Sequence, residues 1–336
     1  MATTKSVFEK LDNYLVDKPR PLIGAETIQL LLIREVLDYT VLRTEEDRQL
    51  NAIVTPLSIS NSTSTRRVAF LATKQKAAES RELEHLLRSA LKDNKLFHVK
   101  GKSLVLKIEN GDNPIECYLK DNLCMECPRC GLYGGTSTVA GQAERANIKH
   151  RIEYSTAFSL MPFEEISSAT TFNAIDDKSI TTGQALGSRH TVAPATLFPS
   201  IVTLKSTTKE ELILAVKTLL SCKSYGAESR IGGDIRNSIV GVIAGWEEVI
   251  TSLELALELY DKKDIISTAT INELIVEKNG KDGKYKRMAG NPDKIVVLNE
   301  NEVNALVKEC ADTKLDRGFL EKAYKDIEEY RKVQLG

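Results

Sequence analysis

The sequence predicts a fold of the α+β class, with most of its 336 residues in one large elaborated domain. Apolar runs of strand length recur through the first 250 residues, and two segments with one apolar helical face lie among them. With insertions set aside, the order is strand, helix, strands, helix, strand. This is the split βαβ or ferredoxin-like plan, which also underlies the RNA-recognition module (RRM). We expect an RRM-like core over residues 20–250 and a mainly helical region, packed on the core, over 251–336.

The first half of the predicted core contains a central strand and a long helix. The run Ile28–Ile33 (IQLLLI) is apolar throughout and has the length of a strand, which predicts burial in the middle of a sheet. Shorter strands are expected at Asp38–Leu42 and Val68–Leu71, and the Ser/Thr/Asn-rich residues 55–65 are expected to form a loop. Leucines at helical spacing predict a helix over Lys74–Leu91.

The second half continues this pattern. Apolar and polar residues alternate through 152–160, which predicts one half-exposed strand, and Leu197–Leu204 predicts another. Thr207 and Glu210 have the spacing of a capping box and are expected to begin the second core helix. The run Ser238–Ala244 predicts the last core strand. Beyond the core, helices are expected at Leu253–Tyr260, Val303–Cys310 and Phe319–Val333.

Four of the six cysteines lie within 14 residues, in the stretch CYLKDNLCMECPRCGLYGG. Thiolates separated by two residues can converge on one ion because a tight turn points both sulfurs inward, and Zn²⁺ takes four such ligands. The sequence therefore predicts a structural zinc knuckle within an insertion at 109–150. Its expected ligands are Cys117, Cys124, Cys127 and Cys130, with His150 as a substitute for one of them. Unconnected reduced thiols and two disulfides are the alternatives.

Charge is balanced over the whole chain but uneven along it. The chain has 46 Lys and Arg against 47 Asp and Glu, so its net charge is −1. From Arg66 to Lys107, 11 basic residues stand against four acidic ones, which gives +7. Such a patch is what nucleic-acid binding requires, and a solvated helix face explains it equally well. No apolar run is long enough to span a membrane, and the crowded cysteines suit a reducing compartment, so a cytoplasmic protein is expected.

Two stretches are suited to binding phosphate. The start of the first core helix offers N–H groups beside Lys74 and Lys76, with Arg81 further along. The stretch GAESRIGGD, at residues 226–234, places Arg230 among glycines that let backbone N–H groups approach a ligand. A plain turn between a helix and a strand is the alternative interpretation of this second stretch.

Residues 164–194 lack clear periodicity and are too long for an idle connection, so a protruding hairpin is expected there. Arg189 and His190 near its end would suit contact with phosphate or bases, and a solvated hairpin end is the alternative. Acidic residues in the loop after the first strand, such as Asp38 and Glu45–Asp47, could in principle hold a catalytic metal. Solvated carboxylates are the commoner explanation of such a loop.

These stretches together resemble the RAMP-superfamily backbone subunits of CRISPR effector complexes, above all the crRNA-binding backbone subunits of subtype I-D Cascade. The resemblance rests on CMECPRCGLYG, GSRHTVAPATLFPSIVTL and YGAESRIGGD, whose order and intervals match that family over about residues 20–250. It implies an RRM-like core with three insertions, which are the zinc knuckle, a thumb-like hairpin at 164–194 and a helical lid.

The resemblance also implies a function. Copies of the chain would stack along the CRISPR RNA and, with other Cascade subunits, present it to a target DNA strand. The residues expected to contact RNA are Arg20, Arg34, Arg43, Lys74, Lys76, Arg81, Arg189, His190, Arg230, Gly232 and Gly233. No catalytic residue is assigned, because no aspartate aligns with the loop that cuts RNA in related type III subunits. A metal-dependent nuclease on the same fold, cutting single-stranded target, is the alternative.

Overall fold

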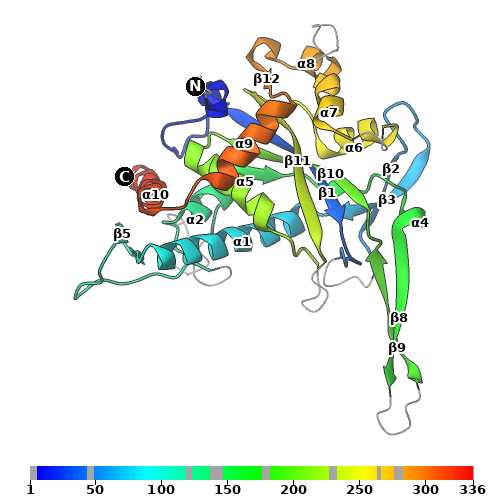
Figure 1. Ribbon diagram of the computed structural model, residues 1–336, viewed down its shortest axis with the longest axis horizontal. Helices are drawn as coiled ribbons and strands as arrows, with labels where there is room; N and C mark the ends of the chain where they lie inside the picture. The colour runs from blue at the N-terminus through cyan, green and yellow to red at the C-terminus, as the bar shows by residue number, and fades with distance from the viewer. Residues whose placement is uncertain are drawn as a thin grey trace.

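The computed structural model describes residues 6–43, 49–118, 123–136, 147–175, 182–226, 233–262, 266–275 and 283–335, with the backbone alone at 170–175 and 182–188. Its centre is an antiparallel five-stranded sheet in the order β12-β11-β1-β10-β6 (Figure 1). These strands are β1 (Thr27–Val36), β6 (Ile152–Tyr154), β10 (Leu197–Lys205), β11 (Ile235–Gly245) and β12 (Val296–Val297). With β12 set aside, the order of the other four and the two helices between them is the split βαβ plan. The predicted α+β class is confirmed.

β1 is the central strand because both of its faces are apolar. It is hydrogen-bonded to β10 on one side and to β11 on the other. Leu30 and Leu32 contribute to the hydrophobic cluster on one face of the sheet, whereas Leu31 and Ile33 contribute to the cluster on the other face. The buried central strand expected at Ile28–Ile33 is therefore present.

Two amphipathic helices cover the first face. α1 (Ala72–Asp93) contains the helix expected at 74–91. α5 (Lys209–Ser221) begins one residue later than expected, because its capping box is formed by Thr208 and Glu211. Glu211 N donates to Thr208 Oγ1 at 3.2 Å, and Thr208 N donates to Glu211 Oε2 at 3.0 Å. Arg151 fixes this register, since its guanidinium donates to Glu211 Oε2 at 2.6 Å.

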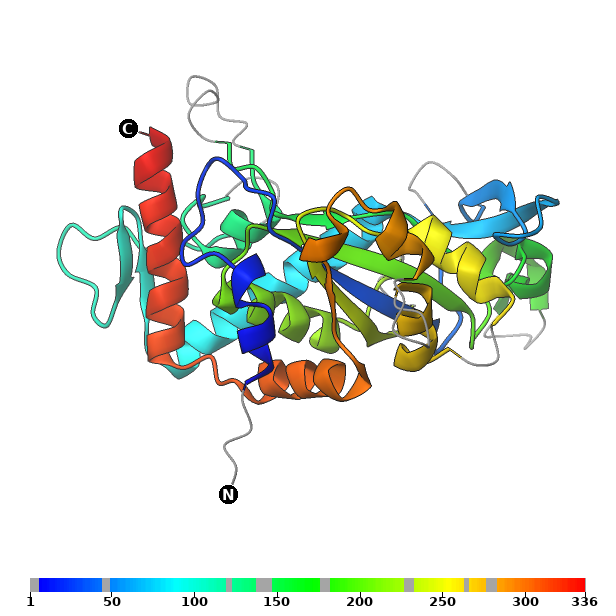
Figure 2. The same cartoon turned by 90° about the horizontal axis from the view of Figure 1, so that it is seen from above.

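The region after residue 250 covers the second face and then returns to the first. α6 (Ser252–Tyr260) and α7 (Thr268–Ile275) pack leucines and isoleucines on the second face of the sheet. α9 (Glu300–Asp312) packs on α5, and α10 (Arg317–Leu335) packs beside α2 and β5 (Figure 2). Within the described residues, no helix combines the length and the apolar character that crossing a membrane requires.

Several short elements complete the structure. A second sheet joins β2 (Ala52–Pro56), β3 (Ser64–Phe70) and β7 (Ala157–Phe158), and a small hairpin joins β4 (Phe97–Val99) to β5 (Lys102–Val105). The short helices are η1 (Val7–Lys10), η2 (Asp12–Tyr14), α2 (Pro128–Tyr133), α4 (Phe163–Ile166), α8 (Lys284–Met288) and η3 (Pro292–Lys294).

Three expected boundaries are wrong. Residues 55–65 do not form one loop, since their ends belong to β2 and β3. The strand expected at Asp38–Leu42 is only an isolated bridge between Thr40 and Val192. The alternating residues 152–160 divide between β6 and β7, which belong to different sheets. A two-residue period does not reveal this break, which arises because β6 pairs with β10 while β7 pairs with β3.

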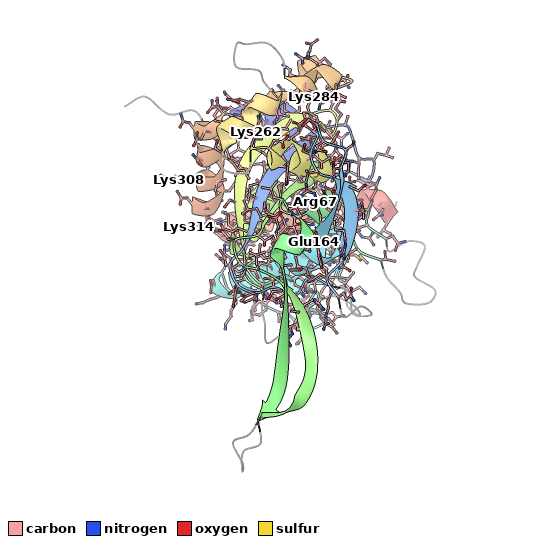
Figure 3. All side chains as sticks on the ribbon, turned by 90° about the vertical axis from the view of Figure 1, so that its right-hand side faces the viewer. Arg67, Glu164, Lys262, Lys284, Lys308 and Lys314 are labelled. Carbon is pink, nitrogen blue, oxygen red and sulfur yellow. The ribbon has the colours of Figure 1, made fainter. Side chains whose placement is uncertain are left out.

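A long two-stranded hairpin leaves the body between β7 and β10. It consists of β8 (Ser167–Ile175) and β9 (Thr182–Val192), whose register runs from Ser167–Val192 to Ile175–Thr182. Figures 1 and 3 show it projecting away from the sheet, below Glu164 of α4. The base of the hairpin is bonded to the body, because Thr40 and Val192 exchange backbone hydrogen bonds.

Candidate nucleic-acid interface and metal site

The segments that the sequence singles out meet at one end of the central sheet, which we call the hairpin end. It is the end where β1 stops at Val36 and where β10 and β11 begin. The chain after β1 is held on one side by the hairpin base, because Thr40 and Val192 exchange backbone hydrogen bonds of 3.1 and 2.8 Å. On the other side, Leu37 N donates to Asp234 O at 2.8 Å. The hairpin base and the residues before β11 thus flank the loop that follows β1.

Only glycine fits at position 233, next to the β1 loop, because any side chain would collide with its neighbours there. Its φ is +62°, in the left-handed region. A Cβ atom there would lie 2.7 Å from Gly226 Cα and 2.8 Å from Thr40 Cγ2. The backbone therefore passes against Gly226 and the β1 loop at a distance only glycine allows. Arg230 and Gly232 lie outside the described residues.

One hydrophobic cluster supports the whole hairpin end. It takes residues from the end of β1, the loop after it, β3, α1, the hairpin base and the entry to β11. Its members include Val36, Leu42, Phe70, Ala78, Val192, Tyr225 and Ile235. Phe70 makes edge-to-face contacts with Phe198 and Tyr225, with ring centroids 5.9 and 5.4 Å apart. Segments distant in sequence are thereby held in one rigid arrangement.

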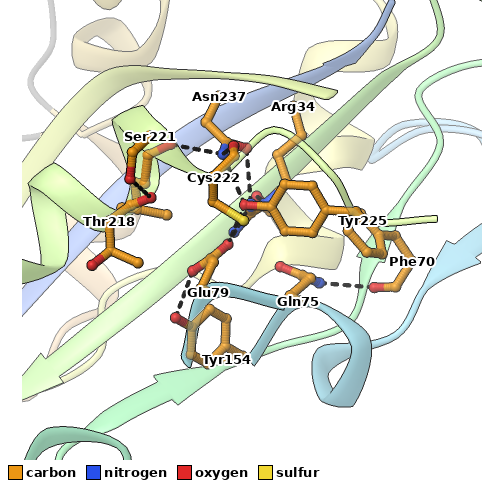
Figure 4. A network of polar contacts seen from close by, with 12 residues as sticks. Arg34, Phe70, Gln75, Glu79, Tyr154, Thr218, Ser221, Cys222, Tyr225 and Asn237 are labelled. Atoms are coloured by element: carbon orange, nitrogen blue, oxygen red, sulfur yellow. Dashed lines mark hydrogen bonds and ion pairs between the residues drawn. The ribbon is translucent and has the colours of Figure 1, made fainter. Parts of the chain in front are cut away.

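Arg34 lies inside this arrangement and not on its surface, so the expectation that it contacts RNA is wrong. Its side chain is fully buried, and Nη1 lies 2.7 Å from Glu79 Oε1 of α1. Arg34 also donates to Ser200 Oγ at 2.9 Å. Its Nη1 donates to Asn237 Oδ1 at 2.8 Å (Figure 4). Burial by itself would lower the pKa of Arg34, but Glu79 outweighs it and keeps the guanidinium charged.

Tyrosine hydroxyls complete this buried network. Tyr225 OH donates to Glu79 Oε1 at 2.8 Å and accepts from Asn237 Nδ2 at 2.8 Å. Tyr154 OH, from β6, donates to Glu79 Oε2 at 2.6 Å. Burial raises the pKa of both phenols, so both stay protonated donors. Because Tyr225 directly precedes Gly226, the network fixes where the glycine-rich stretch leaves the core.

Some of the residues predicted to contact RNA lie near the hairpin end, and others lie elsewhere in the structure. Arg43, Arg189 and His190 are half-buried in the β1 loop and the hairpin base. Lys74 is half-buried in the first turn of α1, one turn before Ala78 of the supporting cluster. Arg81 is exposed further along the same helix. Arg43, Lys74, Arg189 and His190 thus lie within four residues, along the chain, of members of the supporting cluster, and Arg81 lies further along α1.

Two predicted contacts lie elsewhere. Lys76 is half-buried in α1, and burial and then the nearby charge of Arg129, in the cysteine insertion, lower its pKa, while Glu153 raises it. Arg20 lines an open groove with Lys18 and Tyr330, beside the residues that precede β1 and thus at the opposite end of the sheet. Neither residue belongs to the hairpin end.

Part of the positive segment from Arg66 to Lys107 is structural. Arg67 is fully buried and donates to the carbonyls of Ser159 and Leu57 at 2.7 and 2.6 Å. Lys102 pairs with Asp112 at 2.5 Å. The local charge of this segment therefore overstates the charge available to a ligand.

The sheet face itself is closed to nucleic acid. An RRM stacks bases on aromatic side chains of its exposed sheet face. Here Leu31, Ile33, Ile201 and Ile243 occupy that face and are buried under α6 and α7. This face therefore cannot bind nucleic acid in the way that the sheet of an RRM does.

Tyr39 is a candidate contact that the sequence does not reveal. It lies in the loop after β1 and its side chain is 48% exposed, next to Leu37 at 48%. An aromatic ring in this position can stack on a base. Lys223, also exposed, lies beside the entry to β11, since its carbonyl accepts from Ile235 N at 2.8 Å. No sequence signal marks either residue, because exposure here depends on how the loops pack.

The four predicted cysteines converge. Their sulfur atoms all lie within 4.8 Å of one another, and Cys117 Sγ is 3.5 Å from Cys130 Sγ. Tetrahedral zinc–thiolate sites with bonds of about 2.3 Å place sulfurs about 3.8 Å apart, so the group is compatible with structural zinc. His150 is not a member of this group.

The surroundings of the cysteines suit thiolate ligands. Pro128 begins α2, which carries Cys130, and Met125 adopts φ +59° in the turn between Cys124 and Cys127. Glu126 N donates to Cys124 Sγ at 3.4 Å. Contact with Cys117 and the other thiols lowers the pKa of Cys130, and the buried Arg129 adds to this effect.

The described residues give no support to the alternative in which acidic side chains after β1 hold a catalytic metal. Among the described residues, the cysteines are the group of three or more potential ligands close enough to share a metal. Asp38 follows β1, and its carboxylate accepts from Tyr39 N at 2.7 Å. Glu45–Asp47 lie outside the described residues.

The sheet order β11-β1-β10-β6, with α1 and α5 on one face, defines an RRM-like protein of the α+β class. A family model described as Csc2 CRISPR matches residues 13–324, so the chain belongs to the Csc2 CRISPR family. The crystal structure of Thermofilum pendens Csc2 is similar, with a TM-score of 0.60 and 19% identity over 97% of this chain and 98% of that one.

Two further structures are similar to a lower degree. A chain of a type IV-B CRISPR complex has a TM-score of 0.40 and 12% identity, over 62% of this chain and 89% of that one. A chain of a CRISPR RNA-guided surveillance complex, pre-nicking, has a TM-score of 0.46 and 11% identity, over 78% and 88%. No curated protein sequence matches this chain.

Proposed function

We propose that this protein is the crRNA-binding backbone subunit of a subtype I-D Cascade complex and holds its RNA at the hairpin end. The observation that carries this placement is the convergence of the β1 loop, the hairpin base, Gly233 and the start of α1 over one hydrophobic cluster. Membership of the Csc2 CRISPR family supports the class of ligand.

The chemistry of the hairpin end is suited to binding the phosphate backbone of RNA without reading its bases. Arg43 follows the β1 loop, Arg189 belongs to the hairpin base and Lys74 to the first turn of α1, and cationic side chains in such places suit contact with phosphate. Asp38 and Asp234 are exposed at the same end, so its net charge is modest. Sequence is read by guide pairing in such complexes, and the protein holds shape and phosphates.

Several copies would share one RNA strand. Modest contacts in each copy then suffice, because binding to a common strand raises the effective concentration of neighbours. The hairpin at 164–194, bonded to the body at its base, is suited to reach along the RNA or towards the next copy. Presentation of the guide to target DNA follows from this arrangement. The four cysteines would hold a structural zinc ion that braces the insertion.

Tyr39→Ala is expected to weaken binding of single-stranded RNA about 5- to 150-fold, because one base–aromatic stack contributes about 1–3 kcal/mol. The matched control is Trp246→Ala, since Trp246 is also exposed, at 45%, but follows the opposite end of β11. Fluorescence anisotropy with a labelled RNA measures both. Equal losses for the two variants would place the RNA elsewhere.

Lys74→Ala is expected to reduce the slope of log affinity against log salt by about one, the amount for one phosphate contact. Lys325→Ala, a replacement on α10, is the control and should leave the slope unchanged. Affinity should not depend on the RNA sequence. Binding that ignores salt contradicts the proposal, because phosphate contacts release counterions.

A further inference from the structure

Arg129 lies between the four cysteines and α1. It is the second residue of α2, so it stands between the predicted metal ligands Cys127 and Cys130 in the chain. Only 4% of its side chain is exposed. A buried guanidinium is costly unless it is paired and hydrogen-bonded, so the groups around Arg129 indicate what its charge stabilises.

The hydrogen bonds of Arg129 hold its guanidinium beside a sulfur atom. Nε donates to Ser80 Oγ of α1 at 2.8 Å, and Nη1 donates to Gly134 O, just after α2, at 3.2 Å. Nη1 also faces Cys130 Sγ at 3.9 Å. Two bonds to groups of the surrounding structure therefore place the positive charge next to one of the four thiols.

The neighbouring carboxylate of Glu84 does not account for this placement. Its Oε1 lies 3.3 Å from Arg129 Nε but accepts no hydrogen bond, because the single hydrogen on Nε points to Ser80. Its Oε2 lies 3.5 Å from Arg88 Nη2. An arginine that neutralises a carboxylate frequently forms two parallel hydrogen bonds with it. Arg129 instead directs its terminal nitrogen Nη1 towards the sulfur of Cys130.

A metal ion in the four-cysteine group gives Arg129 a partner of opposite charge. Zn²⁺ with four thiolates carries a net charge of 2 − 4 = −2. Cys127 and Cys130 are buried, so little water is available to stabilise this charge. Glu126 N donates to Cys124 Sγ at 3.4 Å, but a backbone amide is neutral. The guanidinium of Arg129 adds a full positive charge beside Cys130.

We propose that Arg129 is a positioning residue of the metal site, which orients the sulfur of Cys130 and offsets the negative charge of the four thiolates. Groups outside the ligand set tune a metal site in this way. The inference rests on the zinc site proposed above and goes beyond its four ligands. Because the same guanidinium bonds to Ser80, it also joins the metal site to α1.

Arg129→Met in the full chain is expected to weaken zinc binding about 10- to 100-fold. Competition with a coloured chelator measures the affinity. Arg129→Lys should regain part of it, because lysine restores the charge but not the bonds to Ser80 and Gly134. With Co²⁺ in place of zinc, the thiolate-to-cobalt charge-transfer band should shift in Arg129→Met. The d–d bands should stay tetrahedral, because no ligand has been removed.

Two control variants separate this role from general stability. Arg67 is also buried, but it donates to the carbonyls of Ser159 and Leu57, away from the cysteines. Arg67→Met should therefore lower stability and leave the zinc affinity unchanged. Glu84→Gln removes the carboxylate beside Arg129 and should not weaken zinc binding, because a carboxylate repels a negatively charged metal site.

An unchanged zinc affinity or an unshifted cobalt band in Arg129→Met overturns the proposal. Equal losses of affinity in Arg67→Met or Glu84→Gln overturn it too, in favour of a purely structural role. Should Arg129→Met fail to fold, Ser80→Ala releases the guanidinium without removing its charge. Ser80→Ala should weaken zinc binding about tenfold, and an unchanged affinity contradicts the proposal. If the unsubstituted protein binds no zinc, the metal site itself is wrong, so the two failures are distinguishable.

Discussion

Arg34→Ala is expected to lower the free energy of unfolding by about 3–5 kcal/mol, because it leaves the Glu79 carboxylate buried without its cation. Both side chains are fully buried, and 2.7 Å separates Nη1 from Oε1. The substitution also removes the donors to Ser200 and Asn237. Urea denaturation followed by circular dichroism measures the loss. Because the network holds Tyr225, RNA binding at the hairpin end should weaken as well.

The chain offers a matched control in a second Arg–Glu pair. Arg236 and Glu35 form an ion pair at the surface, where the Arg236 side chain is 57% exposed. Arg236→Ala should change the stability by about 1 kcal/mol or less, since water screens exposed pairs. If Arg34→Ala costs no more than Arg236→Ala, the buried network does not have the structural role assigned to it.

Cys127→Ser is expected to abolish metal binding and to lower the thermal midpoint by about 5–15 °C, since metal binding to a closed cysteine site contributes directly to folding. Atomic absorption on purified protein should find about one zinc per chain before the substitution and almost none after it. RNA affinity should change less than stability, because the cysteines are joined to the C-terminal half of α1 while the hairpin end adjoins its first turn.

Cys222→Ser is the control that separates the loss of metal binding from the cost of burying a serine hydroxyl. Cys222 is 4% exposed, like Cys127 at 2%, but it packs in the cluster below the hairpin end and outside the four-cysteine group. The Cys222 variant should keep its zinc and lose less stability. Protein that is purified without metal, or equal losses for the two variants, would contradict a structural zinc site.

The local signals were enough to find most elements of the core. Leu30 to Ile33 form an unbroken apolar run, and such a run is expected only where a strand is covered on both faces, as β1 is. The cysteine spacing predicted a cluster that the structure contains. Both signals depend on neighbouring residues, which is why they can be read without a structure.

Other predictions failed where distant segments decide. Thr207 and Thr208 can each begin a capping box, and Arg151, more than 50 residues away, selects Thr208. The break between β6 and β7 depends on which strands each one pairs with. Exposure cannot be read from composition either, because nothing in the sequence shows that Arg34 is buried and Tyr39 is half exposed.

The α+β class, the central strand and the four-cysteine cluster could be predicted from the amino-acid sequence, because periodicity and spacing are properties of short stretches. Which basic side chains are buried could be seen only in the folded chain, because burial depends on the packing of β1, α1, the hairpin base and the entry to β11. Arg34 lies in a buried ion pair with Glu79, and Arg20 lines a groove at the opposite end of the sheet. The order strand, helix, strands, helix, strand therefore predicts the sheet, whereas the surfaces open to a ligand depend on how the connecting loops pack.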